Sequence, residues 1–140
     1  MEVLLVEDDP TDVEITLEAL DCSPFLIHVD VVADGRGAIE RLGDGAPERG
    51  GRRPDLVLLD LKLPEANGHE VLAFIKGQAQ LQSIPVVVLS SSADESDVQR
   101  SYGQHANCYV AKPVELDAFM QVLRSVVEFW FGVAELPTNP

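Results

Sequence analysis

Several short apolar runs in this sequence are each closed by a polar residue that could take part in chemistry. The residues that close four of these runs are the acidic triplet Glu7-Asp8-Asp9, Asp60, Ser90 and Lys112. A carboxylate nucleophile, a metal ion, a cationic side chain and a hydroxyl are the groups that phosphoryl transfer needs, because the transferred group spreads negative charge over three oxygens. The pattern predicts that Asp60 attacks phosphorus and receives the group from an energetic donor, such as a phosphohistidine or a small acyl phosphate.

The acidic residues also predict a metal ion. Carboxylates from the triplet and from Asp60 would repel one another at one edge of a sheet, and such groups are tolerated mainly around a bound cation. Oxygen ligands without His or Cys in the pattern favour Mg²⁺ over Zn²⁺. Asp9 precedes Pro10, which is typical of a solvated helix start, so Asp9 is left out of the predicted metal site.

The apolar runs predict the strands that position these groups. Four runs are apolar at successive positions, which indicates a parallel sheet with both faces buried. A fifth segment is interrupted by His28 and Asp30 and predicts an edge strand with one wetter face. The predicted strands are residues 3–6, 26–32, 56–59, 86–89 and 109–111.

Five segments with helical periodicity alternate with these strands. Their apolar positions are Val13, Leu17 and Leu20; Ile39 and Leu42; Val71, Leu72 and Ile75; Val98 and Tyr102; and Leu116, Phe119, Leu123 and Val127. Asp94 is a candidate helix cap, Gly77 and Gly103 lie near expected helix ends, and residues 43–54 read as an exposed loop. This alternation indicates an α/β doubly wound sheet, which binds ligands at the carboxyl ends of its strands.

Composition limits the remaining possibilities. A chain of 140 residues suits one domain, and a formal net charge of −14 argues against binding to nucleic acid or anionic membranes. No segment resembles a signal peptide or a membrane span, so we expect a cytoplasmic protein. Cys22 and Cys108 are expected to be buried small hydrophobes rather than a disulfide. Surface or capping roles are expected for His28, His69 and His105, because none lies in a ligand-spaced cluster.

Four motifs in order resemble those of the receiver domains of two-component response regulators. They are VLLVEDDP (3–10), DLVLLDLKLPEANG (55–68), IPVVVLSSS (84–92) and NCYVAKPVEL (107–116). The resemblance covers nearly the whole chain and implies a flavodoxin-like (βα)5 fold with strand order 2-1-3-4-5. It also implies a receiver domain over residues 1–128, followed by an aromatic tail over residues 129–140.

The resemblance assigns the metal site residue by residue. Glu7 and Asp8 correspond to the acidic pair, and Asp60 corresponds to the phosphoacceptor and metal ligand. Lys62 would offer its backbone carbonyl to Mg²⁺. The first acid is more often Asp in this family, so the longer Glu7 side chain would reach the metal either directly or through water.

The same resemblance assigns the groups around the phosphoryl oxygens. Ser90 and Lys112 would hold these oxygens, and the bond from Lys112 to Pro113 is expected to be cis. Tyr109 falls at the position of an aromatic switch residue, which turns inward when the hydroxyl of the fourth strand moves toward the phosphoryl group. Tyr109 could equally be a core aromatic, and both roles can hold together.

A narrower resemblance is to the phytochrome-associated single-domain response regulators. It rests on the Glu-Asp pair, the loop GDGAPERGGRRP (43–54) and the tail EFWFGVAELP (128–137). It implies a light-sensing histidine kinase as partner, and a homodimer through the face formed by the fourth helix, the fifth strand and the fifth helix. The adjacent aromatics Phe129, Trp130 and Phe131 cannot all point to one side, and they favour an interface over a tail packed on its own domain.

Three alternatives remain open from the residues. An unphosphorylated interaction scaffold would use the fold for binding alone. A metal-dependent phosphohydrolase of the haloacid dehalogenase type would need a second carboxylate where Lys62 stands. A flavin-binding flavodoxin-like domain would need a phosphate loop after the first strand, where the acidic triplet would repel the cofactor. The predicted function is a phosphorylation-dependent signalling switch whose output is contact with another protein. The only reactions that we expect it to catalyse are the transfer of a phosphoryl group to itself and the later loss of that group.

Overall fold

The protein forms one parallel sheet of five strands. A computed structural model of the chain describes residues 1–43 and 53–137. The strands are β1 (Glu2–Val6), β2 (His28–Val32), β3 (Leu56–Leu59), β4 (Val86–Ser90) and β5 (Cys108–Ala111). Their order is β2-β1-β3-β4-β5 and every neighbouring pair is parallel, so the predicted flavodoxin-like topology is confirmed.

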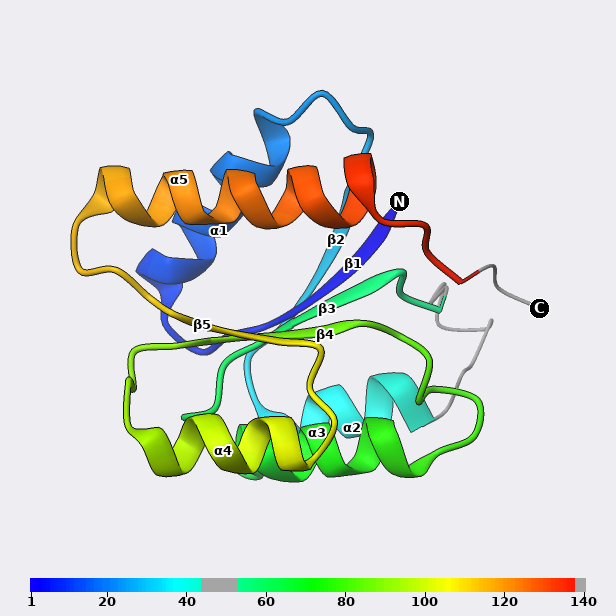
Figure 1. Cartoon of the computed structure of the whole chain (residues 1–140). Helices are drawn as coiled ribbons and strands as arrows, with labels where there is room; N and C mark the ends of the chain where they lie inside the picture. The colour runs from blue at the N-terminus through cyan, green and yellow to red at the C-terminus, as the bar shows by residue number, and fades with distance from the viewer. Residues whose placement is uncertain (44–52, 138–140) are drawn as a thin grey trace.

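Helices cover both faces of the sheet (Figure 1). One layer contains α1 (Pro10–Asp21) and α5 (Leu116–Val127), and the other contains α2 (Gly35–Gly43), α3 (Gly68–Gly77) and α4 (Glu95–Gly103). Most of the loop predicted at residues 43–54 lies outside the described residues, since only Gly43, Arg53 and Pro54 of it are described.

The alternating faces of each strand build two separate cores. On β1, Leu4 and Val6 pack toward α2 and α3, whereas Val3 and Leu5 pack toward α1 and α5. The strands β3 and β4 divide their side chains in the same way. Burial of both faces explains why the strand sequences are apolar at successive positions.

Helix caps agree with the predicted boundaries. Asp9 is the N-cap of α1, where its carboxylate accepts a hydrogen bond of 2.9 Å from the amide of Thr11 and Pro10 opens the helix. Asp94 is the N-cap of α4, and its carboxylate accepts from the amide of Ser96. The Asp9 carboxylate therefore caps the start of a helix, as predicted.

Some positions of the expected helical periodicity do not enter a core. Leu17, Tyr102 and Leu116 are 37%, 48% and 56% exposed. In α4, Ser101 is the one residue that is buried. Polar contacts therefore contribute much of what holds α4 against the rest of the protein.

The cysteines and one histidine differ from expectation. Cys22 is exposed and Cys108 is half-buried, and both are free thiols, so the prediction that both are buried was wrong for Cys22. His28 and His105 lie at the surface as expected, but His69 is buried. The burial of His69 is explained by polar partners on α4, described below.

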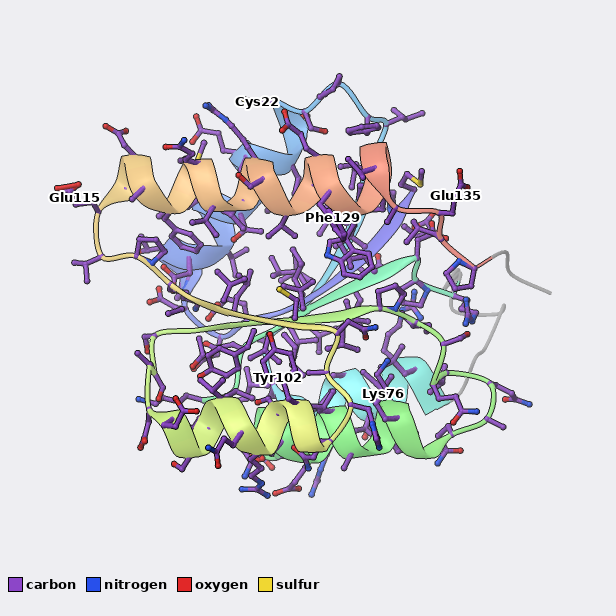
Figure 2. All side chains as sticks on the ribbon, viewed as in Figure 1. Cys22, Lys76, Tyr102, Glu115, Phe129 and Glu135 are labelled. Atoms are coloured by element: carbon purple, nitrogen blue, oxygen red, sulfur yellow. The ribbon has the colours of Figure 1, made fainter. Side chains whose placement is uncertain are left out.

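The last aromatic residues continue α5 rather than leaving it. A π-helical turn, η2 (Glu128–Val133), follows α5 directly. Phe131 is buried, and its ring lies 6.1 Å from that of Phe25, whereas Phe129 is 50% exposed at the end of the helix (Figure 2). Trp130 is half-buried against the core under α1 and α5. Within the described part of the chain, no helix is long and apolar enough to cross a lipid bilayer.

Candidate functional site

The backbone ladder carries the polar residues to one edge of the sheet. Just beyond the strands, the amide of Asp60 donates to the carbonyl of Val6 at 3.0 Å, and the amide of Lys112 donates to the carbonyl of Ser90 at 2.7 Å. The strands β1 and β3 are neighbours at the centre of the sheet, where the chain order reverses. This is the topological switch point at which doubly wound sheets bind their ligands.

Lys112 connects three carboxylates at this edge. Its ammonium forms an ion pair with Glu7, and it lies 2.9 Å from Oδ2 of Asp12 and 3.3 Å from Oδ2 of Asp60. The Lys112 side chain is only 7% exposed, so these contacts are screened little by solvent. Asp12 was not among the predicted site residues, although its place in the first helical turn after an acidic strand end was an available signal.

Glu7, Asp8 and Asp60 form a cluster of possible metal ligands. Each of them offers a carboxylate oxygen, and these oxygens all lie within 4.8 Å of one another. Glu7 and Asp60 are buried and Asp8 is exposed, so the cluster has one side open to solvent. A donor set made only of oxygens fits a hard divalent cation such as Mg²⁺.

The electrostatics of the cluster favour a cation. Burial raises the pKa of Glu7 to about 7, with a further contribution from the nearby charge of Asp60, although the hydrogen bond from Lys112 opposes the rise. Burial by itself would lower the pKa of Lys112, but its hydrogen bonds to Glu7 and Asp12 and the charge of Asp60 outweigh burial and raise it. Lys112 is therefore a permanent cation in this site, whereas Glu7 ionises near neutral pH.

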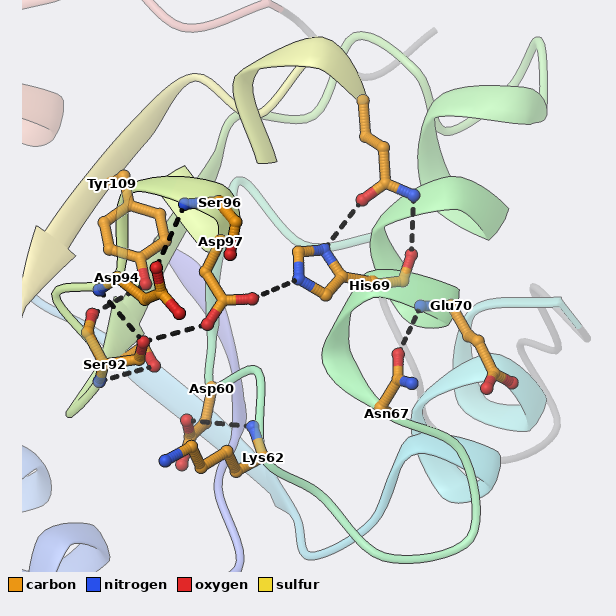
Figure 3. Close-up of polar contacts among 12 residues, drawn as sticks. Asp60, Lys62, Asn67, His69, Glu70, Ser92, Asp94, Ser96, Asp97 and Tyr109 are labelled. Atoms are coloured by element: carbon orange, nitrogen blue, oxygen red, sulfur yellow. Dashed lines mark hydrogen bonds and ion pairs between the residues drawn. The ribbon is translucent and has the colours of Figure 1, made fainter. Parts of the chain in front are cut away.

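The loop after β3 holds Asp60 in place. The amide of Lys62 donates to Oδ1 of Asp60 at 3.3 Å, while the Lys62 side chain is exposed (Figure 3). Gly68 opens α3 directly behind this loop, and a Cβ atom there would lie 2.3 Å from the carbonyl oxygen of Asp60. Only glycine allows this close approach, which explains the glycine at the end of the motif 55–68.

Ser90 and Tyr109 are linked through one residue. Ser90 is fully buried, and its hydroxyl accepts a hydrogen bond of 3.2 Å from the amide of Ser92. The hydroxyl of Tyr109 donates to the carbonyl of Ser92 at 2.8 Å, and its half-buried ring packs against the core. The expectation of a cis bond between Lys112 and Pro113 was wrong, because the described residues contain no cis peptide bond.

The fold and these groups agree with a comparison to known protein families. The family model of the response regulator receiver domain matches residues 3–124. The chain belongs to the response regulator receiver family. This receiver is a phosphorylation-dependent signalling switch and not a conventional enzyme, which confirms the predicted function and disfavours the scaffold and phosphohydrolase alternatives.

Individual relatives confirm the narrower resemblance to phytochrome-associated single-domain regulators. The response regulator Rcp1 of Synechocystis sp. is 38% identical over 135 residues, which cover 96% of this receiver and 92% of Rcp1. The crystal structure of the phosphorylated cyanobacterial phytochrome response regulator RcpA superposes with a TM-score of 0.93 at 42% identity and covers 98% of both chains. The Mn²⁺-bound form of Rcp1 gives a TM-score of 0.92 at 38% identity, with 98% of this receiver and 99% of that chain covered.

Proposed function

We propose that this receiver accepts a phosphoryl group on Asp60 from a sensor histidine kinase, with Mg²⁺ as cofactor. The proposed metal ligands are Glu7, Asp8, Asp60 and the backbone carbonyl of Lys62. The observation that carries the proposal is the Lys112 ammonium, which contacts Glu7 and Asp60 beside the open carboxylate cluster. A cation and a cluster of oxygen ligands around one buried carboxylate are the arrangement that phosphoryl transfer requires.

The chemical step exchanges one bond to phosphorus for another. A carboxylate oxygen of Asp60 attacks the phosphorus of a phosphohistidine, and the new O–P bond forms as the N–P bond breaks. The leaving nitrogen keeps the electron pair of that bond, and the imidazole leaves neutral because its other ring nitrogen carries a proton. Mg²⁺, when bound, would offset negative charge on the phosphoryl oxygens and the carboxylates. Lys112 would exchange a carboxylate contact for a phosphoryl oxygen, and the Ser90 hydroxyl would donate to another. Water later hydrolyses the acyl phosphate without a second enzyme.

Phosphorylation would change the surface formed by α4, β5 and α5, and a partner protein would recognise that change. Ser92 is hydrogen-bonded both to Ser90 and to Tyr109. A shift of the Ser90 hydroxyl toward the phosphoryl group would therefore move Ser92 and, through it, the Tyr109 ring. We propose Tyr109 as the switch residue of this surface. Output would be by contact with another protein.

The proposed partners follow from the relatives and from the charge. RcpA is a phytochrome response regulator, so a bacterial phytochrome kinase in the cytoplasm is the proposed phosphodonor. Nucleic acid is not a proposed partner because the net charge is −14. We also propose a homodimer through the face of α4, β5 and α5. Residues 1–128 would be the receiver, and residues 129–140 a tail at its edge or in the dimer interface.

Intact mass spectrometry tests the site. Incubation with acetyl phosphate and Mg²⁺ should add one phosphoryl group to the wild type, and Asp60→Asn should abolish this addition. Asp9→Asn is the matched control, because asparagine also caps helices and Asp9 lies outside the carboxylate cluster. This control should be labelled as the wild type is. Undiminished labelling of Asp60→Asn would overturn the proposed site.

Light scattering after size-exclusion chromatography tests the homodimer. The wild type should elute with the mass of two chains, and Val114→Glu, which places a charge on a fully exposed residue between β5 and α5, should elute as one chain. Val31→Glu is a control at an exposed apolar residue of β2, at the opposite edge of the sheet from β5, and should remain dimeric. A wild type that is monomeric at high concentration would refute the dimer without affecting the phosphorylation site.

A further inference from the structure

His69 is a buried titratable residue that the proposed phosphoryl transfer does not use. It lies in the first turn of α3 and is 5% exposed. Its Nε2 lies 3.2 Å from Oδ1 of Asp97 on α4, and its Nδ1 lies 2.9 Å from Oε1 of Gln104, at the end of α4. Figure 3 shows the His69 ring between α3 and Asp97. The ring therefore joins two helices that are far apart in sequence.

The hydrogen bonds of His69 define its protonation state. The Gln104 side-chain amide nitrogen donates to the backbone carbonyl of His69 at 3.3 Å, so the Gln104 oxygen faces Nδ1. The Asp97 carboxylate faces Nε2. Both partner atoms are acceptors, and a neutral imidazole has only one N–H to donate. The arrangement is complete only when both ring nitrogens carry protons and His69 is an imidazolium.

The hydrogen bonds of His69 to Asp97 and Gln104 matter because α4 packs against the protein with few buried apolar side chains. Ser101 is its one buried residue, and the Ser101 hydroxyl finds no hydrogen-bond partner among the described residues. At the other side of α4, the Tyr102 hydroxyl accepts a hydrogen bond of 3.1 Å from the amide of Tyr109 on β5. Polar contacts at His69 and Tyr102 thus hold α4 against the rest of the protein. Loss of either contact should therefore change the position of α4.

A continuous set of hydrogen bonds leads from His69 to the proposed switch. The second carboxylate oxygen of Asp97 accepts from the Ser92 hydroxyl at 2.8 Å. Ser92 in turn accepts from Tyr109 through its carbonyl and donates to Ser90 through its amide. His69 is therefore connected to both residues that are proposed to respond to the phosphoryl group.

We propose that His69, as an imidazolium, is a positioning residue of the switch: it fastens α4 to α3 through Asp97 and Gln104, and so holds Ser92 where Ser90 and Tyr109 need it. This inference rests on the proposed function. Loss of a proton from His69 would remove one of its two ring hydrogen bonds, so either Asp97 or Gln104 would lose its donor. The receiver would then respond to pH as well as to phosphorylation.

The charges around the pair support a strong contact. Hydrogen bonds from Ser92 and His69 lower the pKa of Asp97, so the carboxylate that faces the imidazolium stays ionised. The positive charge of Lys62, in the loop before α3, also acts on Asp97 and lowers its pKa. Lys62 is exposed, so solvent weakens its effect.

Nitrogen NMR of the histidine rings tests the protonation state directly. At about pH 6.5, both ring nitrogens of His69 should show the shifts of a protonated imidazolium and should exchange slowly with solvent. Asp97→Asn should convert His69 to a single neutral tautomer at this pH. A neutral His69 in the wild type would overturn the inference, and this readout does not depend on phosphorylation.

Binding of beryllium fluoride with Mg²⁺, a phosphoryl mimic, tests the coupling to the switch. The amide shifts of Ser92 and Tyr109 report the binding. His69→Gln should bind the mimic about fivefold more weakly than the wild type at acidic pH, which is the low end of ordinary coupling between sites. This difference should become smaller at higher pH, because a neutral imidazole can donate only one of the two ring hydrogen bonds. Protonation of Glu7 also affects binding of the mimic, but it does so in the wild type and in His69→Gln alike. The ratio of the affinities of these two proteins therefore reports the effect of His69.

His105→Asn is the matched control. His105 is exposed just beyond α4 and has a positive φ of 72°, which asparagine tolerates. It should bind the mimic as the wild type does at every pH. Equal affinities of His69→Gln and the wild type for the mimic would refute the coupling. If His69→Gln does not fold, Asp97→Asn takes its place in the same comparison with the wild type. If the wild type itself binds no mimic, the proposed function fails instead.

Discussion

The Nζ atom of Lys112 lies 3.3 Å from Oδ2 of Asp60, and it also forms ion pairs with Glu7 and Asp12. A cation that directly follows β5 thus neutralises carboxylates that lie just after β1, in α1 and just after β3. Without such a cation, the buried charges of Glu7 and Asp60 would be costly, because burial in a low dielectric disfavours unpaired ions. The same ammonium is in contact with the residue that is proposed to carry the phosphoryl group.

Lys112→Met should destabilise the metal-free protein by roughly 3 kcal/mol, because it leaves buried carboxylates without their cation. A bound divalent cation would replace part of the lost charge, so Mg²⁺ should recover much of this stability. Urea unfolding with EDTA and with Mg²⁺ measures both effects. Lys62→Met is the control, because its side chain is exposed and should matter little. Equal losses with and without Mg²⁺ would contradict a cation site next to Lys112.

Glu7 should make the metal-free protein less stable as the pH rises toward neutrality. Burial raises its pKa in the folded state to about 7 from 4.5, so between these values the folded state binds more protons than the unfolded state. Stability from this group is complete below about pH 4.5 and is lost as the pH rises through about 7, with at most about 3 kcal/mol in total. Urea unfolding in EDTA at several pH values measures this loss.

Glu7→Gln is the variant that isolates this effect, because glutamine keeps the shape and does not ionise. The pH dependence of stability between about 4.5 and 7 should be much flatter in this variant. Glu14→Gln, at an exposed position of α1, is the control and should keep the wild-type dependence. A slope that survives Glu7→Gln would show that another group is responsible.

Much of the site could be predicted because its residues directly follow buried strands. Asp60 and Lys112 each come after a run that is apolar on both faces, and parallel strands bring their carboxyl ends to one edge. Asp12 was missed because it lies in the first turn of α1, and only the folded structure shows that its carboxylate reaches Lys112, 100 residues away in the sequence. His69 was misjudged for the same reason, since Asp97 and Gln104 are 28 and 35 residues away in the sequence.

The fold was predictable to the extent that burial controls the sequence pattern. The strands β1, β3 and β4 are buried on both sides, and their predicted bounds differ from the observed ones by at most one residue. The edge strand β2 begins at His28 rather than at residue 26, because its exposed side weakens the apolar pattern. In α4 the expected apolar positions do not reach a core, because polar contacts hold that helix.

Gly68→Ala should destabilise the receiver by about 1 to 3 kcal/mol, the ordinary cost of overpacking, and should also disturb Asp60. Its added methyl would lie 2.3 Å from the Asp60 carbonyl oxygen and 2.5 Å from the Cα atom of Leu61, and neither backbone atom can move freely. Gly77→Ala, at the other end of α3, adds a Cβ that meets no described atom within 4 Å outside its own stretch of helix backbone, and it should leave stability unchanged or slightly higher. Thermal unfolding and acetyl phosphate labelling of both variants measure the contrast, and equal behaviour would contradict the close approach.

Ser90→Ala should weaken the binding of beryllium fluoride with Mg²⁺ by about tenfold or more, because a hydrogen bond to a charged oxygen contributes roughly 1.5 to 3 kcal/mol. The hydroxyl of Ser90 is buried at the end of β4 and accepts from the amide of Ser92, so its loss should change folding stability by only about 1 kcal/mol. Ser91→Ala is the control, since the neighbouring Ser91 is exposed and follows the strand. Titration followed by the amide signals of Ser92 and Tyr109 measures both affinities. Unchanged binding in Ser90→Ala would mean that this hydroxyl does not contact the phosphoryl group and that Tyr109 must sense phosphorylation by another route.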